Sequence, residues 1–162
     1  YSTITHTPLE ITNVSIVKLI EEVNSDIRQL LNEKGGEIIV KNLPEHILAD
    51  SSRIYQLLQN LLTNALRYSR DGVAPVIVIS GEEGATHYHF EIADNGIGIE
   101  NEFFDQIFVL FKTLENKSIS NSSGIGLATC KKVIEDHKGK IWLESKVGEG
   151  TTFYFTIAKN LD

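Results

Sequence analysis

The chain has a single cysteine, no methionine and only three prolines among its 162 residues. One cysteine excludes an internal disulfide and suits a reducing compartment, and we expect Cys130 to be a small buried hydrophobic residue. No apolar run is long enough to span a bilayer, and no signal-peptide pattern is present. Because even position 1 is not methionine, we expect the sequence to be a piece of a longer protein.

Positive charge is also scarce. The chain has 15 Lys and Arg residues against 22 Asp and Glu residues, a formal net charge of −7, and no basic run. Nucleic-acid binding depends on clustered basic residues, so we expect no nucleic-acid partner. The length and a hydrophobic content of 41% are typical of one globular domain with a real core.

The spacing of apolar residues predicts short strands and amphipathic helices. Strands are expected over residues 9–14, 38–40, 76–80, 88–92, 140–145 and 151–157, the last two as a hairpin. Helices are expected over about 16–34, 51–69 and 124–137, with Lys138-Gly139 as the last helix's C-terminal signal. Residues 102–111 are expected to form a short helix packed on the core, or else a hinge. Ser15 and either Asp50 or Ser51 are the expected N-caps.

The most informative stretch is Ala-Asp-Asn-Gly-Ile-Gly-Ile at residues 93–99, which follows the strand expected at 88–92. Alternate residues of a strand share a face, so Asp94 falls on the apolar, buried side. An unpaired carboxylate there is costly and needs a donor, which a bound ligand can supply. Gly96 and Gly98 allow the backbone to approach that ligand closely.

The alternative for this stretch is a plain Asp-Asn-Gly hairpin turn, which is common chemistry between two strands. A hairpin would be followed by a returning strand. Residues 100–104, Glu-Asn-Glu-Phe-Phe, instead indicate the start of a helix, which weakens that alternative.

The helix expected at 51–69 carries a line of polar side chains beside its apolar stripe. Asn60, Asn64 and Arg67 are four and three residues apart, so they stack along the helix at the edge of its buried face. The Asn64 oxygen suits a hard cation such as Mg²⁺, and Arg67 suits a phosphate. A solvated flank with surface amides explains the same spacing, and the helix by itself does not decide between the two.

A second glycine pattern lies later in the chain. Residues 112–123 have no apolar periodicity and indicate a mobile loop, and Gly124-Ile125-Gly126-Leu127 then opens a helix. A glycine loop at a helix N-terminus presents free N–H groups and the positive end of the dipole to an anion. Gly-x-Gly alone is a weak signal, and its flanking loop and helix strengthen it.

Taken together, the blocks at residues 59–69, 94–99, 107–111, 123–128 and 148–153 follow a fixed order. They resemble the N box, first glycine box, F box, second glycine box and terminal hairpin of the histidine-kinase ATP-binding domain. That domain belongs to the superfamily of gyrase, heat-shock chaperone, histidine kinase and mismatch-repair ATPases. Residues 107–114 most resemble phytochrome-like sensor kinases.

The resemblance implies a Bergerat-type fold, an α/β two-layer sandwich. In this fold a mixed, mainly antiparallel sheet carries helices on one face, and ATP lies between the two layers. It also implies that residues 1–8 are a linker from a missing dimerisation and phosphoacceptor domain. Residues 9–160 are then the kinase domain, with a mobile lid at about 109–123.

The resemblance assigns roles to individual positions. The Asp94 carboxylate would accept a hydrogen bond from the adenine amine, Asn64 would hold Mg²⁺ with support from Asn60, and Arg67 would contact phosphate. Tyr68 would pack beside the nucleotide. The other implied nucleotide-binding positions are Gly96, Gly98, Ile99, Phe111, Lys112, Ser123, Gly124, Ile125, Gly126, Leu127 and Thr151, the last reaching the adenine side through water.

The implied function is that of the ATP-binding catalytic domain of a two-component sensor histidine kinase. It would hold Mg-ATP and donate the γ-phosphate to a histidine on a separate helical domain, for relay to a response regulator. None of the five histidines here has the acceptor's sequence context, so we expect no self-phosphorylation. We expect a homodimeric intact protein, a monomeric isolated domain and a cytoplasmic location, whether or not the intact protein is membrane-anchored.

Two departures from the family pattern keep other functions open. Ser122 stands where the second glycine box usually has its first glycine, and Thr113 stands where the F-box region often has Arg. A degenerate nucleotide-binding signalling module is therefore one alternative. An ATPase of the gyrase or mismatch-repair type is another, but it would need a Glu as base where this chain has Asn60.

Overall fold

The computed structural model describes residues 8–109 and 123–162. The expected linker, except Pro8, and most of the expected lid lie outside these residues. So do Phe111 and Lys112, two of the expected nucleotide contacts.

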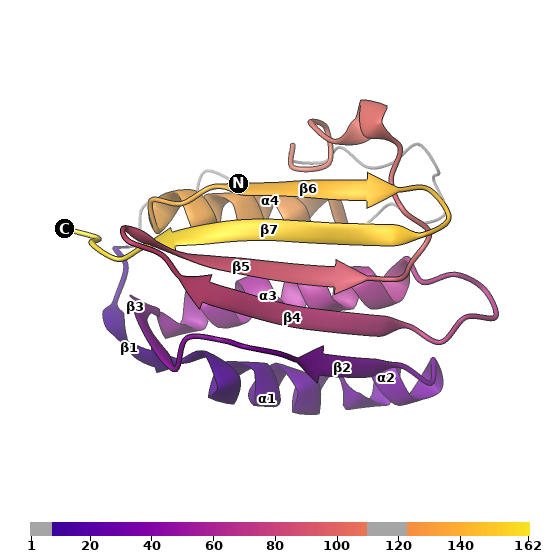
Figure 1. The fold of residues 1–162 in the computed structure, drawn as a ribbon, viewed down its shortest axis with the longest axis horizontal. Helices are drawn as coiled ribbons and strands as arrows, with labels where there is room; N and C mark the ends of the chain where they lie inside the picture. Colours follow the sequence, from indigo (N-terminus) through magenta and orange to yellow (C-terminus); the bar gives the residue numbers. More distant parts are fainter. Residues whose placement is uncertain (1–7, 110–122) are drawn as a thin grey trace.

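The described residues include a five-stranded sheet in the order β2-β4-β5-β7-β6 (Figure 1). Its strands are β2 (Glu37–Val40), β4 (Val76–Glu83), β5 (His87–Asp94), β6 (Ile141–Lys146) and β7 (Gly150–Ala158). The β2–β4 pair is parallel, and the other three neighbouring pairs are antiparallel. The prediction of a mixed, mainly antiparallel sheet is confirmed.

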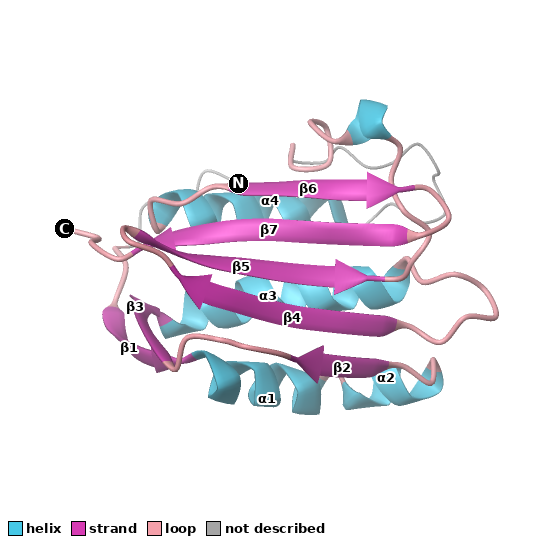
Figure 2. Ribbon diagram, viewed as in Figure 1, coloured by secondary structure: helices cyan, strands magenta, loops and turns pink. Residues whose placement is uncertain are grey.

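The helices of the described part lie together behind this sheet (Figure 2). They are α1 (Ile16–Asp26), α2 (Arg28–Glu33), α3 (Ser51–Arg67) and α4 (Ser123–Asp136). The apolar stripe of α3, including Leu57 and Leu61, is buried in one core with Ile77, Ile79 and Ile92 of the sheet. The expected two-layer sandwich with helices on one face is therefore confirmed.

A smaller antiparallel sheet pairs β1 (Ile11–Ser15) with β3 (His46–Asp50). The sequence predicted β1 but not β3, because β3 is short and only two of its apolar residues, Ile47 and Ala49, face the core, while Leu48 is exposed. Its partner strand lies some thirty residues earlier in the chain, so no local turn marks the pairing.

The helix starts were predicted well, and one helix interior was not. Ser15 and Asp50 are the N-caps, accepting hydrogen bonds from the backbone of Lys18 and Arg53. The single helix expected over 16–34 is divided at Ile27. The i→i−4 hydrogen bonds continue on both sides of Ile27, from Ile27 N to Val23 O and from Leu31 N to Ile27 O. The chain therefore bends there and stays on a helical path.

Two further expectations need correction. Strand β4 runs on to Glu83, three residues beyond the strand expected over 76–80, because Gly81 pairs with Phe90 of β5. In place of a helix from residue 102, the described residues have a 3₁₀ turn at Asn101–Phe103. The apolar residues after this turn still pack on the core, as expected, and Phe108 meets Phe153 edge-on.

The end of α4 also differs from the prediction in detail. Lys138, and not Gly139, adopts the left-handed backbone conformation, with φ of 57°. Gly139 is needed for another reason, since a side chain there would collide with the Thr156 carbonyl. Within α4, Cys130 is fully buried as expected, and burial raises the pKa of its thiol to about 12.

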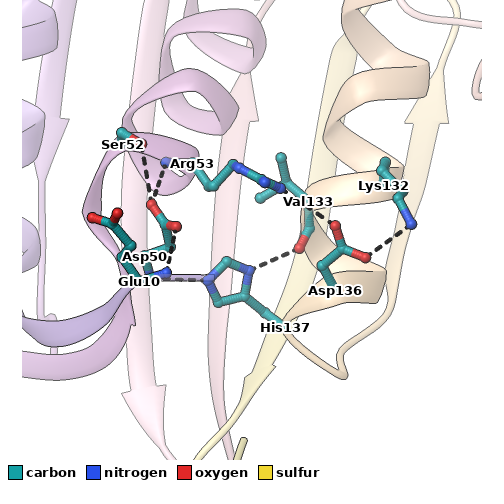
Figure 3. A network of polar contacts seen from close by, with 8 residues as sticks. All are labelled: Glu10, Asp50, Ser52, Arg53, Lys132, Val133, Asp136 and His137. Carbon is teal, nitrogen blue, oxygen red and sulfur yellow. Dashed lines mark hydrogen bonds and ion pairs between the residues drawn. The ribbon is translucent and has the colours of Figure 1, made fainter. Parts of the chain in front are cut away.

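A polar network centred on buried Asp50 and His137 joins the end of α4 to the start of α3 (Figure 3). His137 is fully buried, its Nδ1 donating to the Val133 carbonyl at 2.8 Å and its Nε2 accepting from the Asp50 backbone N–H at 3.1 Å. Arg53 and Lys132 both form ion pairs with Asp136. The tautomer of His137 is fixed by these partners, and burial lowers its pKa, so the ring is neutral.

Candidate functional site

Asp94 ends β5 beside the start of β7, on the side of the sheet that the helices cover. Its Oδ1 accepts hydrogen bonds from Gly96 N at 2.8 Å and Thr151 N at 3.2 Å. Among residues 8–109 and 123–162, no group donates a hydrogen bond to Oδ2. Burial raises the pKa of Asp94 above its ordinary value, and the two N–H donors oppose that rise without cancelling it. The carboxylate is therefore held in place by one oxygen while the other keeps its capacity to accept.

The two glycines of the 93–99 stretch are required by the surroundings. A side chain at Gly96 would place its Cβ 2.5 Å from the Tyr68 carbonyl oxygen. Gly98 has φ of 79°, and a side chain there would collide with the backbone of Lys146. These positions let the loop pass closely between the end of α3 and the β6–β7 hairpin.

Hydrogen bonds fix this loop at three successive points. Ile97 N donates to the Tyr68 carbonyl at 2.9 Å, Gly148 N donates to the Ile97 carbonyl at 2.7 Å, and Ile99 N donates to Ser145 Oγ at 2.7 Å. The loop is not a hairpin turn, since the 3₁₀ turn at Asn101–Phe103 follows it and not a returning strand. Tyr68 supports the loop through its backbone, and its expected packing beside a nucleotide stays a prediction.

The polar line of α3 runs from the interior to the surface. Asn64 is only 6% exposed, Asn60 is half-buried and Arg67 is exposed. Asn60 Nδ2 donates to the Gly126 carbonyl at 3.3 Å, which ties the middle of α3 to the first turn of α4. This placement disfavours a simple solvated flank for the two asparagines.

The Asn64 side-chain oxygen is buried and has no hydrogen-bond partner among the residues that the structure describes. An unpaired buried oxygen is costly, and it is also the hard donor that Mg²⁺ prefers. Such an atom does not define a site by itself, because Asn24 on α1 has one as well. Asn64 differs by standing one turn from Asn60 and the glycines of α4. Its donor chemistry fits a magnesium ion.

The start of α4 agrees with the expected helix opening. Residues 123–127 form the first turn of α4, and Gly126 lies against Asn60. Leu127 is buried in the core. Its side chain is therefore a packing residue, and the expected contacts of residues 123–127 with phosphate through backbone N–H groups remain predictions.

Thr151 lies on the buried side of β7, as its alternation with Phe153 and Phe155 predicted. Its hydroxyl lies 2.7 Å from Ser145 Oγ, a residue that the sequence analysis missed. Ser145 shares the inward parity of Ile141 and Leu143 on β6. A polar residue on an apolar parity is the same signal that identified Asp94, and it could have found Ser145.

Asn95 is a second residue whose role was missed. Its Oδ1 accepts from Val76 N at 2.9 Å and its Nδ2 donates to the Ala74 carbonyl at 3.1 Å. Arg70 Nε donates to the Asn95 carbonyl at 2.9 Å. Asn95 therefore joins the loop after β5 to the start of β4, directly beside Asp94. Its place in the Asp-Asn-Gly turn was the available signal.

The site residues thus form two groups along α3. One surrounds Asp94 and brings together Gly96, Thr151, Ile99 and the Tyr68 backbone. The other brings Asn60 to Gly126, next to Asn64. Among the described residues, no hydrogen bond or ion pair joins the Arg67 side chain to either group.

Comparison with known proteins agrees with this arrangement. Residues 49–161 match the family model described as "Histidine kinase-, DNA gyrase B-, and HSP90-like ATPase". The chain is 39% identical over 148 residues to the phytochrome-like protein Cph1 of Synechocystis sp., covering 91% of this chain and 20% of that protein. It is 43% identical over 142 residues to cyanobacterial phytochrome A of Nostoc sp., covering 88% and 18%. The chain therefore spans about a fifth of the length of these relatives.

Solved structures show the same fold. The catalytic domain of histidine kinase ThkA superposes with a TM-score of 0.79 at 31% identity, covering 93% of this chain and 97% of that one. ThkA in complex with the response regulator TrrA gives 0.75 at 29% identity, covering 94% and 43%. Full-length ShkA in complex with AMPPNP gives 0.80 at 26% identity, covering 95% and 32%.

The fold and the family match define this chain as an ATP-binding domain. It belongs to the histidine kinase-, DNA gyrase B- and HSP90-like ATPase family, and the ThkA structures that it resembles are those of a histidine kinase. The resemblance found in the sequence, including its phytochrome-like element, is confirmed. Within the described residues, no helix combines the length and apolar character needed to cross a membrane.

Proposed function

We propose that this domain binds ATP with the adenine at Asp94 and the phosphates near the start of α4, and that it serves as a phosphoryl donor. The observation that carries the proposal is a pair of acceptors that no described residue satisfies, the second carboxylate oxygen of half-buried Asp94 and the buried side-chain oxygen of Asn64. The adenine amine is a donor that suits the first acceptor. Guanine has a carbonyl in that place and does not.

A magnesium ion would be held by Asn64, with Asn60 fixing α3 against α4. When bound, it would neutralise charge on the phosphates. In this proposal Arg67 contacts phosphate from the helix end, and backbone N–H groups of residues 123–127 meet the phosphate oxygens. Gly96, Gly98 and Ile99 shape the adenine pocket, Tyr68 packs beside the nucleotide, and Thr151 contributes on the adenine side. The proposal extends to Phe111 and Lys112 on sequence alone.

The phosphoryl acceptor in this proposal is a histidine on another domain of the intact protein, which then passes the group to a response regulator. The structural neighbour ThkA was solved with its response regulator, and ShkA with an ATP analogue, which supports such a cycle here. We propose that the intact protein is a homodimer and works in the cytoplasm. A water-activating base is not offered by Asn60, whose amide already bonds to Gly126, and this argues against a gyrase-type ATPase.

Calorimetric titration with ATP and GTP, each with and without Mg²⁺, tests the nucleotide site. The folded wild type should bind ATP, bind GTP more weakly, and bind ATP more tightly with Mg²⁺. Asp94→Asn should weaken ATP binding about 100-fold, because the Asn amide would turn its N–H₂ toward the adenine amine. Glu91→Gln, on the same strand but exposed on the other face, is the matched control and should change nothing. A folded wild type that ignores millimolar ATP would contradict the proposal.

The donor role has a separate test. Incubation of the domain with γ-labelled ATP should leave no label on this chain. Rapid release of labelled phosphate by the domain alone would instead favour an ATPase.

A further inference from the structure

The Ser145 hydroxyl stands at the junction of three hydrogen bonds. Its Oγ lies 2.9 Å from the Gly150 carbonyl oxygen, 2.7 Å from Ile99 N and 2.7 Å from Thr151 Oγ1. A serine hydroxyl has one proton to donate and two lone pairs to accept with. The Gly150 carbonyl can only accept, so it takes the Ser145 proton. The Ile99 N–H can only donate, so it occupies one lone pair.

One position then remains on Ser145 Oγ, and it is an acceptor. The Thr151 hydroxyl must therefore donate its proton to Ser145. The Thr151 oxygen keeps its lone pairs and has no proton left for a ligand. The direction of this hydroxyl is not a property of Thr151 itself, since it is imposed by Ser145.

Thr151 and Asp94 are joined directly, because Thr151 N donates to Asp94 Oδ1. Thr151 is only 6% exposed and lies on the same side of the sheet as Asp94. This end of the site therefore presents acceptors, the Asp94 carboxylate and the Thr151 oxygen, without a hydroxyl donor between them. An exocyclic amine has two N–H groups to offer to such a pair. A carbonyl in its place would face lone pairs on both.

We propose that Ser145 is a positioning residue that fixes the Thr151 hydroxyl as an acceptor beside Asp94 and so sets the preference for an amine-bearing base over a carbonyl-bearing one. The inference rests on the proposed ATP site and adds a specificity determinant to it. Sites built around hydrogen-bond partners discriminate strongly against ligands that leave those partners unmatched.

The test is the ratio of ATP to inosine triphosphate (ITP) affinities, measured by calorimetry. ITP carries a carbonyl in place of the amine, together with a proton on N1. In Ser145→Ala the Thr151 proton is free to turn toward the base and donate to that carbonyl. The ATP preference should therefore fall at least about fivefold, mainly through tighter ITP binding. Ser145→Thr keeps a hydroxyl on the same carbon and should restore the wild-type ratio.

A double-mutant cycle shows whether Ser145 acts through Thr151. The ratio in Ser145→Ala/Thr151→Val should equal that in Thr151→Val alone, since no hydroxyl is then left to direct. Independent, additive effects of the two substitutions would overturn the proposal. So would an unchanged ratio in folded Ser145→Ala. Thr152→Val, whose side chain lies on the other face of β7, is the matched control and should keep the wild-type ratio.

Stability and specificity are separated by this design. A purely structural role would lower the thermal midpoint of Ser145→Ala without altering the ATP to ITP ratio, and that result counts against the proposal. If Ser145→Ala does not fold, Ser145→Cys retains a side chain of similar size with a weak donor and should shift the ratio in the same direction. Failure of the wild type to bind ATP would reject the proposed function itself, which is a distinct outcome.

Discussion

Two aspartates of this domain are placed alike and paired differently. Asp50 ends β3 and Asp94 ends β5. The carboxylates of both accept hydrogen bonds from backbone N–H groups. Asp50 uses both oxygens, accepting from Glu10 N, Ser52 Oγ and Arg53 N (Figure 3). Asp94 uses one oxygen for both of its donors. Described residues donate hydrogen bonds to both oxygens of Asp50, which is therefore a complete carboxylate, but to only one oxygen of Asp94, which is an incomplete one.

The pKa directions follow from this difference. Burial by itself would raise the pKa of Asp50, but the hydrogen bonds from Glu10, Arg53 and Ser52 and the charge of Arg53 hold it below its ordinary value. Burial raises the pKa of Asp94, because two N–H groups are not enough to offset it. A complete set of partners marks a structural carboxylate, and an incomplete set marks one that awaits a ligand.

The largest stability effect should come from the complete network. Asp50→Ala removes the N-cap of α3 and leaves the N–H groups of Glu10 and Arg53 without their acceptor. We expect a loss of about 3 kcal/mol of unfolding free energy and a fall of roughly 10 °C in the thermal midpoint. Urea unfolding measures the first and thermal unfolding the second. Asp71→Ala, in an exposed turn, is the control. An equal loss of unfolding free energy in this variant would contradict a special structural role for Asp50.

A substitution at the proposed metal ligand Asn64 should change ligand affinity more than the stability of the free domain. Asn64→Ala removes an oxygen to which no described residue donates a hydrogen bond, so we expect the free domain to lose less than about 1 kcal/mol of unfolding free energy. The gain in ATP affinity that Mg²⁺ provides should fall about tenfold, because a metal ligand is lost. Calorimetry with and without Mg²⁺ measures it. Asn24→Ala also removes an unpaired buried oxygen and should leave the effect of Mg²⁺ on ATP affinity intact. An equal loss of that effect in both variants would contradict the assignment of Asn64 as the metal ligand.

The smallest effect should appear in the pH dependence of stability. The pKa of His137 is lowered below its ordinary value near 6.5 by burial, with Asp50, Asp136 and Arg53 facing the ring. The unfolding free energy that His137 contributes in its neutral form is therefore fully present above pH 6.5. It is lost as the pH falls from there toward the pKa of the folded state. The slope cannot exceed about 1.4 kcal/mol per pH unit for one proton.

His137→Gln should flatten this part of the curve while lowering stability at pH 7. Denaturant unfolding between pH 7 and pH 5 measures both. A slope that survives in His137→Gln would place the titrating group elsewhere.

Much of the fold could be predicted because its signals are local. The alternation before Asp94 gave the buried side of β5, and Ser15 and Asp50 gave the helix starts. β3 was missed because its pairing with β1 depends on contacts distant in the chain. The bend at Ile27 carries no Gly or Pro to mark it. The left-handed conformation falls on Lys138, whereas Gly139 is the residue that leaves no room for a Cβ against Thr156.

The site residues could likewise be predicted only where their signal in the sequence is local. Asp94 was found because a charged residue on an apolar parity can be recognised from the sequence. Sequence spacing put Asn60 and Asn64 on one line, but not the bond from Asn60 to Gly126 or the missing partner of Asn64. The direction of the Thr151 hydroxyl depends on Ser145, Ile99 and Gly150 meeting in space. Relations of that kind cannot be derived from residue spacing.

The central claim is that Asp94 is an incomplete carboxylate kept for a nucleotide. Because its pKa is raised, ionised Asp94 lowers the stability of the free domain as the pH rises through that pKa. Thermal unfolding of Asp94→Asn with and without Mg-ATP tests this most directly. We expect a midpoint without ligand no lower than that of the wild type, and no rise on adding Mg-ATP, whereas Asp50→Ala should show a lower midpoint that still rises with Mg-ATP. A less stable Asp94→Asn that is still stabilised by Mg-ATP would contradict the account.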